Sequence, residues 1–350
     1  MTKIVLNSDL IDKISELVRN ARAGIVRTVN YTMTTTYFEI GRMIVEDEQS
    51  GNKRADYGKQ ILISLSERLT RENGKGFSVD NLERMKKFYI LYSPKISATV
   101  LRKLVSDGKQ LQKHQALSDI FKLSWSHYLM LMRIDDENER KFYEIEAIQN
   151  NWSLRELQRQ YDSGLYLRLA LSKNKKKVLA LAAKGQIIEK PEDAIKDPYI
   201  LEFTGLPERS NYSESNLEQK IIDKMANFLL ELGKGFSFVG RQVRFTFEEE
   251  HFRVDLVFYN RILKCFVLID LKIGKLTHQD IGQMQMYVNY YDREVKSEDE
   301  NKTIGIVLCQ KKKKAVIEYT LPKDNKQIFA SKYMTILPKK EELKRLIENS

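Results

Sequence analysis

Three charged residues interrupt apolar runs late in the chain. Residues 266–274, FVLIDLKIG, begin like a buried strand and then carry Asp270 and Lys272. A second apolar run, residues 252–260, carries Asp255. Burying an unpaired charge costs on the order of several kcal/mol or more. These positions therefore predict a site that uses charge, and not a simple sheet core.

The expected strand geometry brings the three side chains together. Side chains alternate along a strand, so Asp270 and Lys272 share one face. The short connection at residues 260–264 predicts a hairpin, whose pairing can place Asp255 near Asp270. We expect two carboxylates and one ammonium to converge at the end of a half-buried sheet. The alternative is an ordinary Asp270–Lys272 ion pair at a strand end, with Asp255 in a turn.

This combination suits metal-assisted hydrolysis of a phosphodiester. Two clustered carboxylates repel, and one takes up a proton unless a cation is present. Mg²⁺ prefers oxygen ligands and is commonly held by one or two carboxylates plus a substrate phosphate; we expect that Mn²⁺ can substitute. The ion polarises a phosphoryl oxygen and lowers the pKa of a bound water. A lysine beside it can orient or deprotonate that water, or stabilise charge on the phosphorus. Asp255 and Asp270 are thus predicted metal ligands, and Lys272 a catalytic residue.

The elements around these residues follow an α/β pattern. Apolar periodicity predicts helices at 216–233 and 278–295. Strands are predicted at 236–247 and 302–310, beside the two that carry the charged residues. The expected unit is a central mixed sheet with helices against it.

The first half of the chain reads as helical. Helices are predicted around residues 10–18, 31–48, 57–69 and 79–92, the last capped by Ser78. Two capping-type sequences, this one and Ser153 with Glu156, mark helix starts.

The helix at 79–92 is the predicted nucleic-acid reader. It is basic and follows a glycine-containing turn, which is the outline of a helix-turn-helix or winged-helix domain. Arg84, Lys86 and Lys87 are its predicted nucleic-acid contacts. Helical hairpins with basic surfaces are common, so an ordinary solvated face is the alternative.

Length and composition predict two domains. The 350 residues suffice for two domains of ordinary size. Residues 172–200 are lysine-rich and contain two prolines, which indicates a junction. We therefore divide the chain into a helical domain at 1–172, a basic linker at 173–200 and an α/β domain at 201–345. The fold class is α+β multidomain.

Net charge and cysteine content indicate which partners the protein binds and in which cellular compartment it lies. The formal net charge is +11, which favours a polyanion such as nucleic acid, although solubility alone is an alternative. No apolar run is long enough to span a bilayer, and no secretory leader is evident. Cys265 and Cys309 lie in strand-like runs and are expected to be buried and free. We expect a cytoplasmic protein without a membrane partner.

Asp255 followed by Asp270-Leu271-Lys272 resembles the core of the PD-(D/E)XK nuclease superfamily. More closely, the block at 252–292 resembles the YhcG-like family of bacterial nuclease-domain proteins, as do LSWSHYLMLMRI and NWSLRELQRQ. Proteins of that family join an N-terminal helical, winged-helix-like domain to a C-terminal nuclease domain. The resemblance implies a restriction-endonuclease-like fold at 201–345 and Mg²⁺-dependent cleavage of double-stranded or branched DNA. Val254 stands where many members have proline, and Asp270 where many have glutamate.

The resemblance also implies three supporting residues. Glu218, on the helix before the strands, would be a further catalytic residue and metal ligand. Gln283 and Tyr287 resemble the Q-x-x-x-Y element, with Gln283 supporting the catalytic site and Tyr287 contacting nucleic acid. Each has a structural alternative. Ser215 and Glu218 also form a capping-box sequence, Gln283 fits a solvated helix face, and Tyr287 fits a core.

Two other functions remain open from the sequence. The protein could be a catalytically idle nucleic-acid-binding or assembly subunit of a larger defence or recombination complex, although all the expected charged residues are present. An RNA substrate would suit the same chemistry, but no aromatic RNA-reading strand is evident. The resemblance favours bacterial DNA recombination, repair or defence. Many nucleases pair to cut both strands, so a homodimer is compatible with this chemistry, but the sequence does not reveal the oligomeric state.

Overall fold

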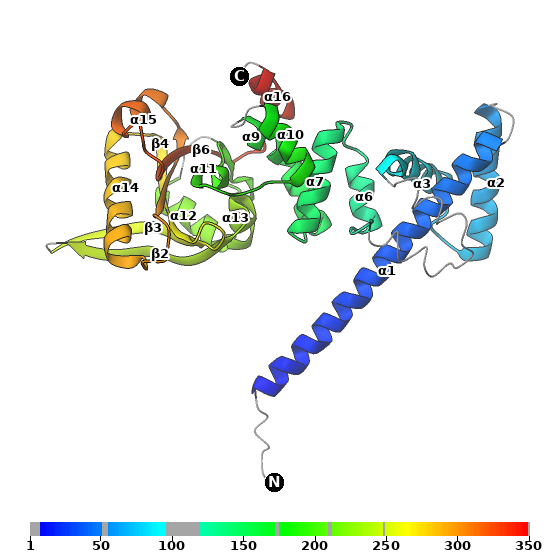
Figure 1. Ribbon diagram of the computed structural model, residues 1–350, viewed down its shortest axis with the longest axis horizontal. Helices are drawn as coiled ribbons and strands as arrows, with labels where there is room; N and C mark the ends of the chain where they lie inside the picture. The colour runs from blue at the N-terminus through cyan, green and yellow to red at the C-terminus, as the bar shows by residue number, and fades with distance from the viewer. Residues whose placement is uncertain are drawn as a thin grey trace, which may run out of the picture. The chain divides into compact units, whose positions relative to one another are not determined.

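The computed structural model describes residues 8–50, 55–95, 120–171, 175–208, 212–247 and 249–348. The chain divides into two compact units, Met1–Arg140 and Lys141–Ser350. None of the helices in these ranges is long and apolar enough to cross a membrane. Both units are drawn in Figure 1 and are described separately here.

The described part of the first unit consists of helices, with no strand among its residues. They are α1 (Ser8–Ser50), α2 (Ala55–Asn73), α3 (Val79–Tyr92), the short η1 (Ser93–Lys95) and α6 (Trp125–Leu131). The predicted α2 and α3 are confirmed, and Ser78 caps α3 by accepting a hydrogen bond from the Asn81 backbone. Gly41 allows α1 to approach the α3 backbone, because a Cβ there would overlap the carbonyl of Met85.

The two helices predicted within the first 50 residues are one helix. α1 runs unbroken over 43 residues. The stretch between the predicted helices contains no proline, and its single glycine, Gly24, costs a helix only about 1 kcal/mol. The predicted separation was therefore wrong.

Further helices precede the sheet along the chain. They are α7 (Glu137–Gln149), α8 (Leu154–Asp162), α9 (Leu165–Leu171), α10 (Lys175–Lys184) and α11 (Pro191–Ala194). The capping box of Ser153 and Glu156 opens α8 as predicted. The buried guanidinium of Arg168 on α9 lies 2.6 Å from a carboxylate oxygen of buried Glu231.

The structure differs from the predicted linker at 173–200. Its described part contains α10, α11 and the first strand, and Lys196 is buried with its ammonium donating to the Glu231 carbonyl. Pro191 starts α11 and Pro198 immediately precedes the first strand, so neither proline marks an exposed connector. The second compact unit begins at Lys141 and therefore includes this segment.

The sheet of the second unit is mixed, as predicted. Its strands are β1 (Tyr199–Ile200), β2 (Phe236–Phe247), β3 (Glu250–Asn260), β4 (Cys265–Lys275), β5 (Ile304–Lys311) and β6 (Ile328–Met334). The spatial order is β1-β6-β5-β4-β3-β2. The pairs β2–β3 and β3–β4 are antiparallel, whereas β4–β5, β5–β6 and β6–β1 are parallel.

Helices cover both faces of this sheet. On one face lie α12 (Glu214–Asp223) and α13 (Met225–Leu232), and on the other α14 (His278–Tyr290) and α15 (Lys314–Thr320). The remaining elements are η2 (Glu202–Thr204), η3 (Tyr291–Val295) and α16 (Lys340–Glu348). Figure 1 shows α14 running along the sheet at the end where β2 and β3 project.

Two details of this unit test the sequence patterns. The single helix predicted at 216–233 is interrupted at Lys224, whose backbone leaves the helical region, so α12 and α13 bury separate stripes. The predicted alternation along β4 is confirmed. Val267, Ile269 and Leu271 pack on the α12 side, and Leu268 packs on the α14 side. Both cysteines are buried and free.

Candidate active site

The site forms where β3 and β4 separate. Their pairing runs from Asn260 opposite Cys265 to Leu256 opposite Ile269 and ends there. The next residues in this register are Asp255 and Asp270. The Asp255 Oδ2 atom accepts a hydrogen bond from the backbone nitrogen of Leu271 at 2.8 Å, in place of a carbonyl of β3. The predicted hairpin thus brings Asp255 beside the Asp270 segment.

We call the point beyond Leu256 and Ile269, where β3 and β4 separate, the fork. Beyond it, a side chain of α12 supports the backbone of β4. The backbone nitrogen of Ile273 donates to Glu214 Oε1 at 3.0 Å. Carboxylates of β3 and α12 thus satisfy backbone donors that the separated strand would leave unpaired. The fork is therefore built into the sheet and is not a frayed end.

Asp270 is the most strongly perturbed group of the site. Its side chain is buried, and its Oδ2 atom lies 2.9 Å from the Lys272 ammonium. Burial, and then the charge of Asp255, raise the pKa of Asp270 to about 7, against the opposing effect of Lys272. Burial is the largest single effect on Lys272 and lowers its pKa, but the charge and hydrogen bond of Asp270, together with the charges of Glu214 and Asp255, make the net shift upward. The ion pair considered as an alternative exists, yet Asp255 adds an uncompensated negative charge.

Glu218 enters the same site from α12. Its side chain is buried, and its Oε2 atom accepts a hydrogen bond from Gln242 Nε2 at 2.6 Å. Gln242 Nε2 also lies 3.0 Å from Asp255 Oδ1, so one amide bridges the two carboxylates. Arg241 Nε lies 3.2 Å from Glu218 Oε1. Burial, together with the charge of Asp255, raises the pKa of Glu218, although the Gln242 hydrogen bond opposes the shift.

The capping alternative for Glu218 is wrong. The N-cap of α12 is Ser213, whose side chain accepts from the backbone of Asn216. The helix begins two residues earlier than a Ser215 cap would require. Glu218 is therefore free to face the site.

Gln242 is the residue that sequence reasoning missed. It lies in the β2 register between Arg241, opposite Leu256, and Val243, opposite Val254, and therefore faces Asp255. Its φ of 47° is unusual for a residue other than glycine and costs on the order of 1–3 kcal/mol. A polar residue among the apolar residues of the predicted strand at 236–247 was the available signal. A left-handed backbone cannot be recognised from a glutamine in the sequence.

Gln283 and Tyr287 meet on α14. Gln283 Nε2 donates to the Tyr287 hydroxyl, so the predicted i, i+4 pair forms. Tyr287 is 1% exposed, and burial, then the charge of Asp270, raise its pKa to about 12. Its burial favours the core-packing alternative over a direct nucleic-acid contact. The charges of Asp270 and Lys272 act on Tyr287, so the Gln283–Tyr287 pair lies near the site.

The predicted nucleic-acid residues of α3 lie in the first unit. Arg84 and Lys87 are exposed, and Arg84 donates to the Asn81 side chain at 3.1 Å. Lys86 forms an ion pair with Glu48 of α1. Arg84 and Lys87 therefore expose their positive charges to solvent, whereas the charge of Lys86 is paired with Glu48.

The donors at the fork suit a hard cation. Among the described residues, no group of three or more His, Cys, Asp and Glu side chains has the arrangement of a metal centre. Asp270 Oδ2 and Glu218 Oε1 are buried, and each lies against one cationic side chain, Lys272 at 2.9 Å and Arg241 at 3.2 Å. Mg²⁺ needs only one or two carboxylates, because it keeps waters and binds phosphate. Asp255 and Asp270 therefore fit such an ion, with Glu218 joined to Asp255 through the Gln242 amide.

Comparisons with known proteins agree with this geometry. Residues 13–168 match the family model described as the DUF1016 N-terminal domain, and residues 192–348 match the YhcG PDDEXK nuclease domain. A protein of Escherichia coli strain K12 named "Putative nuclease YhcG" is 40% identical over 343 residues, which is 95% of this chain and 91% of that protein.

Solved structures give more distant similarities. A repair endonuclease from Pyrococcus abyssi matches with a TM-score of 0.26 and 15% identity, over 37% of this chain and 50% of that one. An EndoMS–dsDNA2 complex matches with a TM-score of 0.25 and 16% identity, over 36% of this chain and 46% of that one. The chain thus spans about half the length of these solved chains.

Proposed function

The chain belongs to the YhcG family of PD-(D/E)XK nuclease-domain proteins, and from that membership we propose that it is a metal-dependent DNA endonuclease. The observation that carries the proposal is the meeting of Asp255, Asp270 and Lys272 at the fork between β3 and β4. Glu218 adds a third carboxylate through Gln242.

Asp255 and Asp270 would hold Mg²⁺, or Mn²⁺ in its place, and Glu218 would assist directly or through a water. The ion would polarise a phosphoryl oxygen of the substrate and lower the pKa of the attacking water. Lys272 has a raised pKa and stays protonated at neutral pH, so it can only donate hydrogen bonds. Its role is therefore to stabilise negative charge on the phosphorus and not to remove a proton. Gln283 supports the site by holding Tyr287.

The proposed substrate is double-stranded or branched DNA. Arg84 and Lys87 of α3 would contact phosphates in a salt-dependent manner, as part of a winged-helix-like reader. The proposed role is bacterial DNA recombination, repair or defence in the cytoplasm, which two free cysteines suit. A homodimer, or membership of a larger complex, would bring two such sites to one duplex.

Cleavage assays test the proposal. Linear, nicked and branched DNA, and RNA of the same sequences, are incubated with Mg²⁺ or Mn²⁺. We expect cleavage of DNA by the native protein, and none by Asp270→Ala despite retained DNA binding. Cleavage by Asp270→Ala at the native rate contradicts the assignment. Binding without cleavage by the native protein would instead support an idle assembly subunit.

A further inference from the structure

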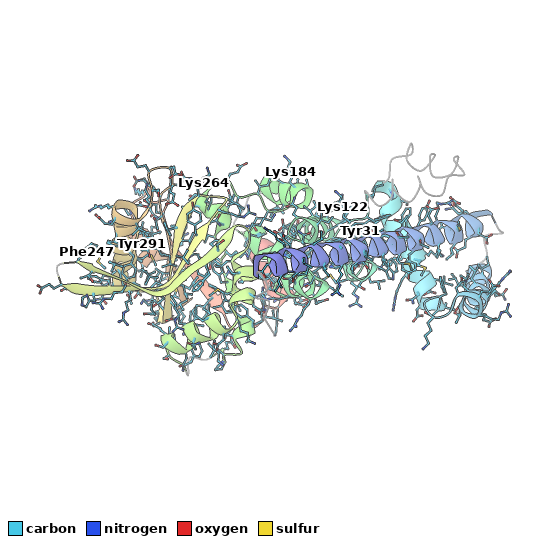
Figure 2. The ribbon with its side chains drawn as sticks, turned by 90° about the horizontal axis from the view of Figure 1, so that it is seen from below. Tyr31, Lys122, Lys184, Phe247, Lys264 and Tyr291 are labelled. Carbon is cyan, nitrogen blue, oxygen red and sulfur yellow. The ribbon has the colours of Figure 1, made fainter. Side chains whose placement is uncertain are left out.

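The β2–β3 hairpin projects past the rest of the sheet. β4 pairs only with Leu256–Asn260 of β3, whereas β3 residues 250–254 pair only with β2. Figure 2 shows Phe247 at the projecting end of this hairpin. We refer to residues 241–247 and 249–254 as the arm.

One face of the arm is anchored on α14. Phe245 stacks on Tyr290 with ring centroids 4.3 Å apart and planes at 13°. It also contacts Tyr287 and stacks on Phe252 across the two strands. A two-stranded ribbon is only marginally stable alone, so this aromatic packing holds the arm in place. On the opposite face, the side chains of Arg244, Thr246, His251 and Arg253 are exposed to solvent.

The exposed face carries two arginines in direct opposition. Arg244 lies across from Arg253, and both side chains are exposed. Like charges directly opposite each other destabilise a strand pair. Within the described part of the chain, neither arginine has a carboxylate partner. The fold itself therefore gains nothing from this pair.

The side chain of Arg244 is nevertheless held in position. Its Nη2 atom lies 2.7 Å from His251 Nε2. A guanidinium only donates, so Nε2 accepts, and Nδ1–H of the neutral ring donates to the Thr246 hydroxyl at 3.0 Å. Thr246 and His251 are themselves a cross-strand pair on this face. A cation oriented in this way can bind an anion with less loss of side-chain entropy.

The arginines lie close to the candidate active site. Arg244 follows Gln242 by two residues and Arg253 precedes Asp255 by two, so each is roughly 7 Å along its strand from a site residue. Arginine matches phosphate geometry with paired hydrogen bonds. We propose that Arg244 and Arg253 on the exposed face of the arm bind the phosphate backbone of duplex DNA next to the bond that is cut. This inference rests on the proposed nuclease function and assigns a substrate-binding surface to it.

The test measures binding without cleavage. A fluorescein-labelled DNA duplex is titrated with the full chain in EDTA, by anisotropy, over a series of salt concentrations. The double variant Arg244→Gln/Arg253→Gln should bind about tenfold more weakly at low salt, and its log–log salt slope should fall by about 2. The matched control is Arg261→Gln/Arg293→Gln, which removes two exposed arginines outside the arm. The control should keep the native affinity and slope.

Thermal melting shows whether the variant is folded. Since the opposed arginines repel, the double variant should melt at or above the native temperature. Native affinity and slope in the double variant would overturn the proposal, as would failure of the native protein to bind the duplex at low salt. Cleavage of the same duplex by the native protein with Mg²⁺ is scored separately. If the native protein cleaves the duplex and the double variant binds it with native affinity, the arm does not bind DNA, but the proposed nuclease function still holds.

Discussion

The carboxylate of Asp255 caps the backbone nitrogen of Leu271, at a distance of 2.8 Å, where the pairing of β3 and β4 ends. This contact fixes Asp255 against the segment that carries Asp270. Asp255 thus has two roles, accepting this hydrogen bond and supplying negative charge to the proposed metal site. The two can be separated, because an amide oxygen could accept the same hydrogen bond but carries no charge.

Asp255→Asn and Asp255→Ala should therefore differ in stability but not in activity. Asparagine can still accept from Leu271, whereas alanine leaves that buried donor unpaired, at a cost of about 1–3 kcal/mol. Both variants lose a metal ligand and should lose cleavage. Urea denaturation and a nicking assay measure the two effects. Equal stability of the two variants would show that the Leu271 contact does not hold the fork.

Asp270 makes the stability of the metal-free protein depend on pH. Its pKa rises from 3.8 to about 7 on folding, so the native state favours the protonated form. The resulting stability is present below pH 4 and is lost as the pH rises toward 7. Asp270→Asn mimics the protonated form and should gain stability over the native protein through that window, reaching on the order of 3 kcal/mol above pH 7.

Melting temperatures in EDTA from pH 4 to pH 8 measure this difference. The matched control is Asp324→Asn, an exposed aspartate outside the site, whose melting curve should follow the native one at every pH. A pH-independent offset between Asp270→Asn and the native protein contradicts the buried environment of Asp270 beside the charge of Asp255.

Gln242 is expected to be a positioning residue. Gln242→Leu removes the amide that bridges Glu218 and Asp255 and should lower kcat about tenfold to a hundredfold with little change in KM. Gln219→Leu is a control, because Gln219 contacts Arg241 and Asp223 and neither site carboxylate. A purely structural role would instead lower the melting temperature and leave kcat of the folded fraction unchanged.

Lys272 should act as a positively charged hydrogen-bond donor that stabilises negative charge on the phosphorus, and not as a general base. Lys272→Met should lower kcat by about 10²–10³-fold, the effect of removing one electrostatic donor. Lys272→Arg keeps a positive donor and should retain more activity than methionine. If Lys272 were a general base, arginine would be as inactive as methionine, since it cannot accept a proton at any accessible pH.

Much of the fork could be predicted from the sequence, because it depends on local rules. A short connection predicted the hairpin, and two-residue alternation predicted that Asp270 and Lys272 share a face with Leu268. The helices α2 and α3 followed from periodicity and the Ser78 cap.

The features that the sequence did not predict depend on tertiary contacts. The left-handed backbone of Gln242 and the break at Lys224 occur at residue types that do not require them. Lysine content made 173–200 look like a connector, whereas the partner of Lys196 is Glu231 on α13, far along the chain. No local pattern distinguishes a buried, paired lysine from a solvated one.

Anomalous difference density from crystals soaked in Mn²⁺ measures directly whether Asp255 and Asp270 together hold a divalent ion. We expect one peak bound by oxygens of both carboxylates, at about 2.0–2.3 Å, and its loss in Asp270→Ala. Absence of a peak at the fork, in crystals of a protein that still cleaves DNA with Mn²⁺, would show that these two carboxylates do not hold the ion.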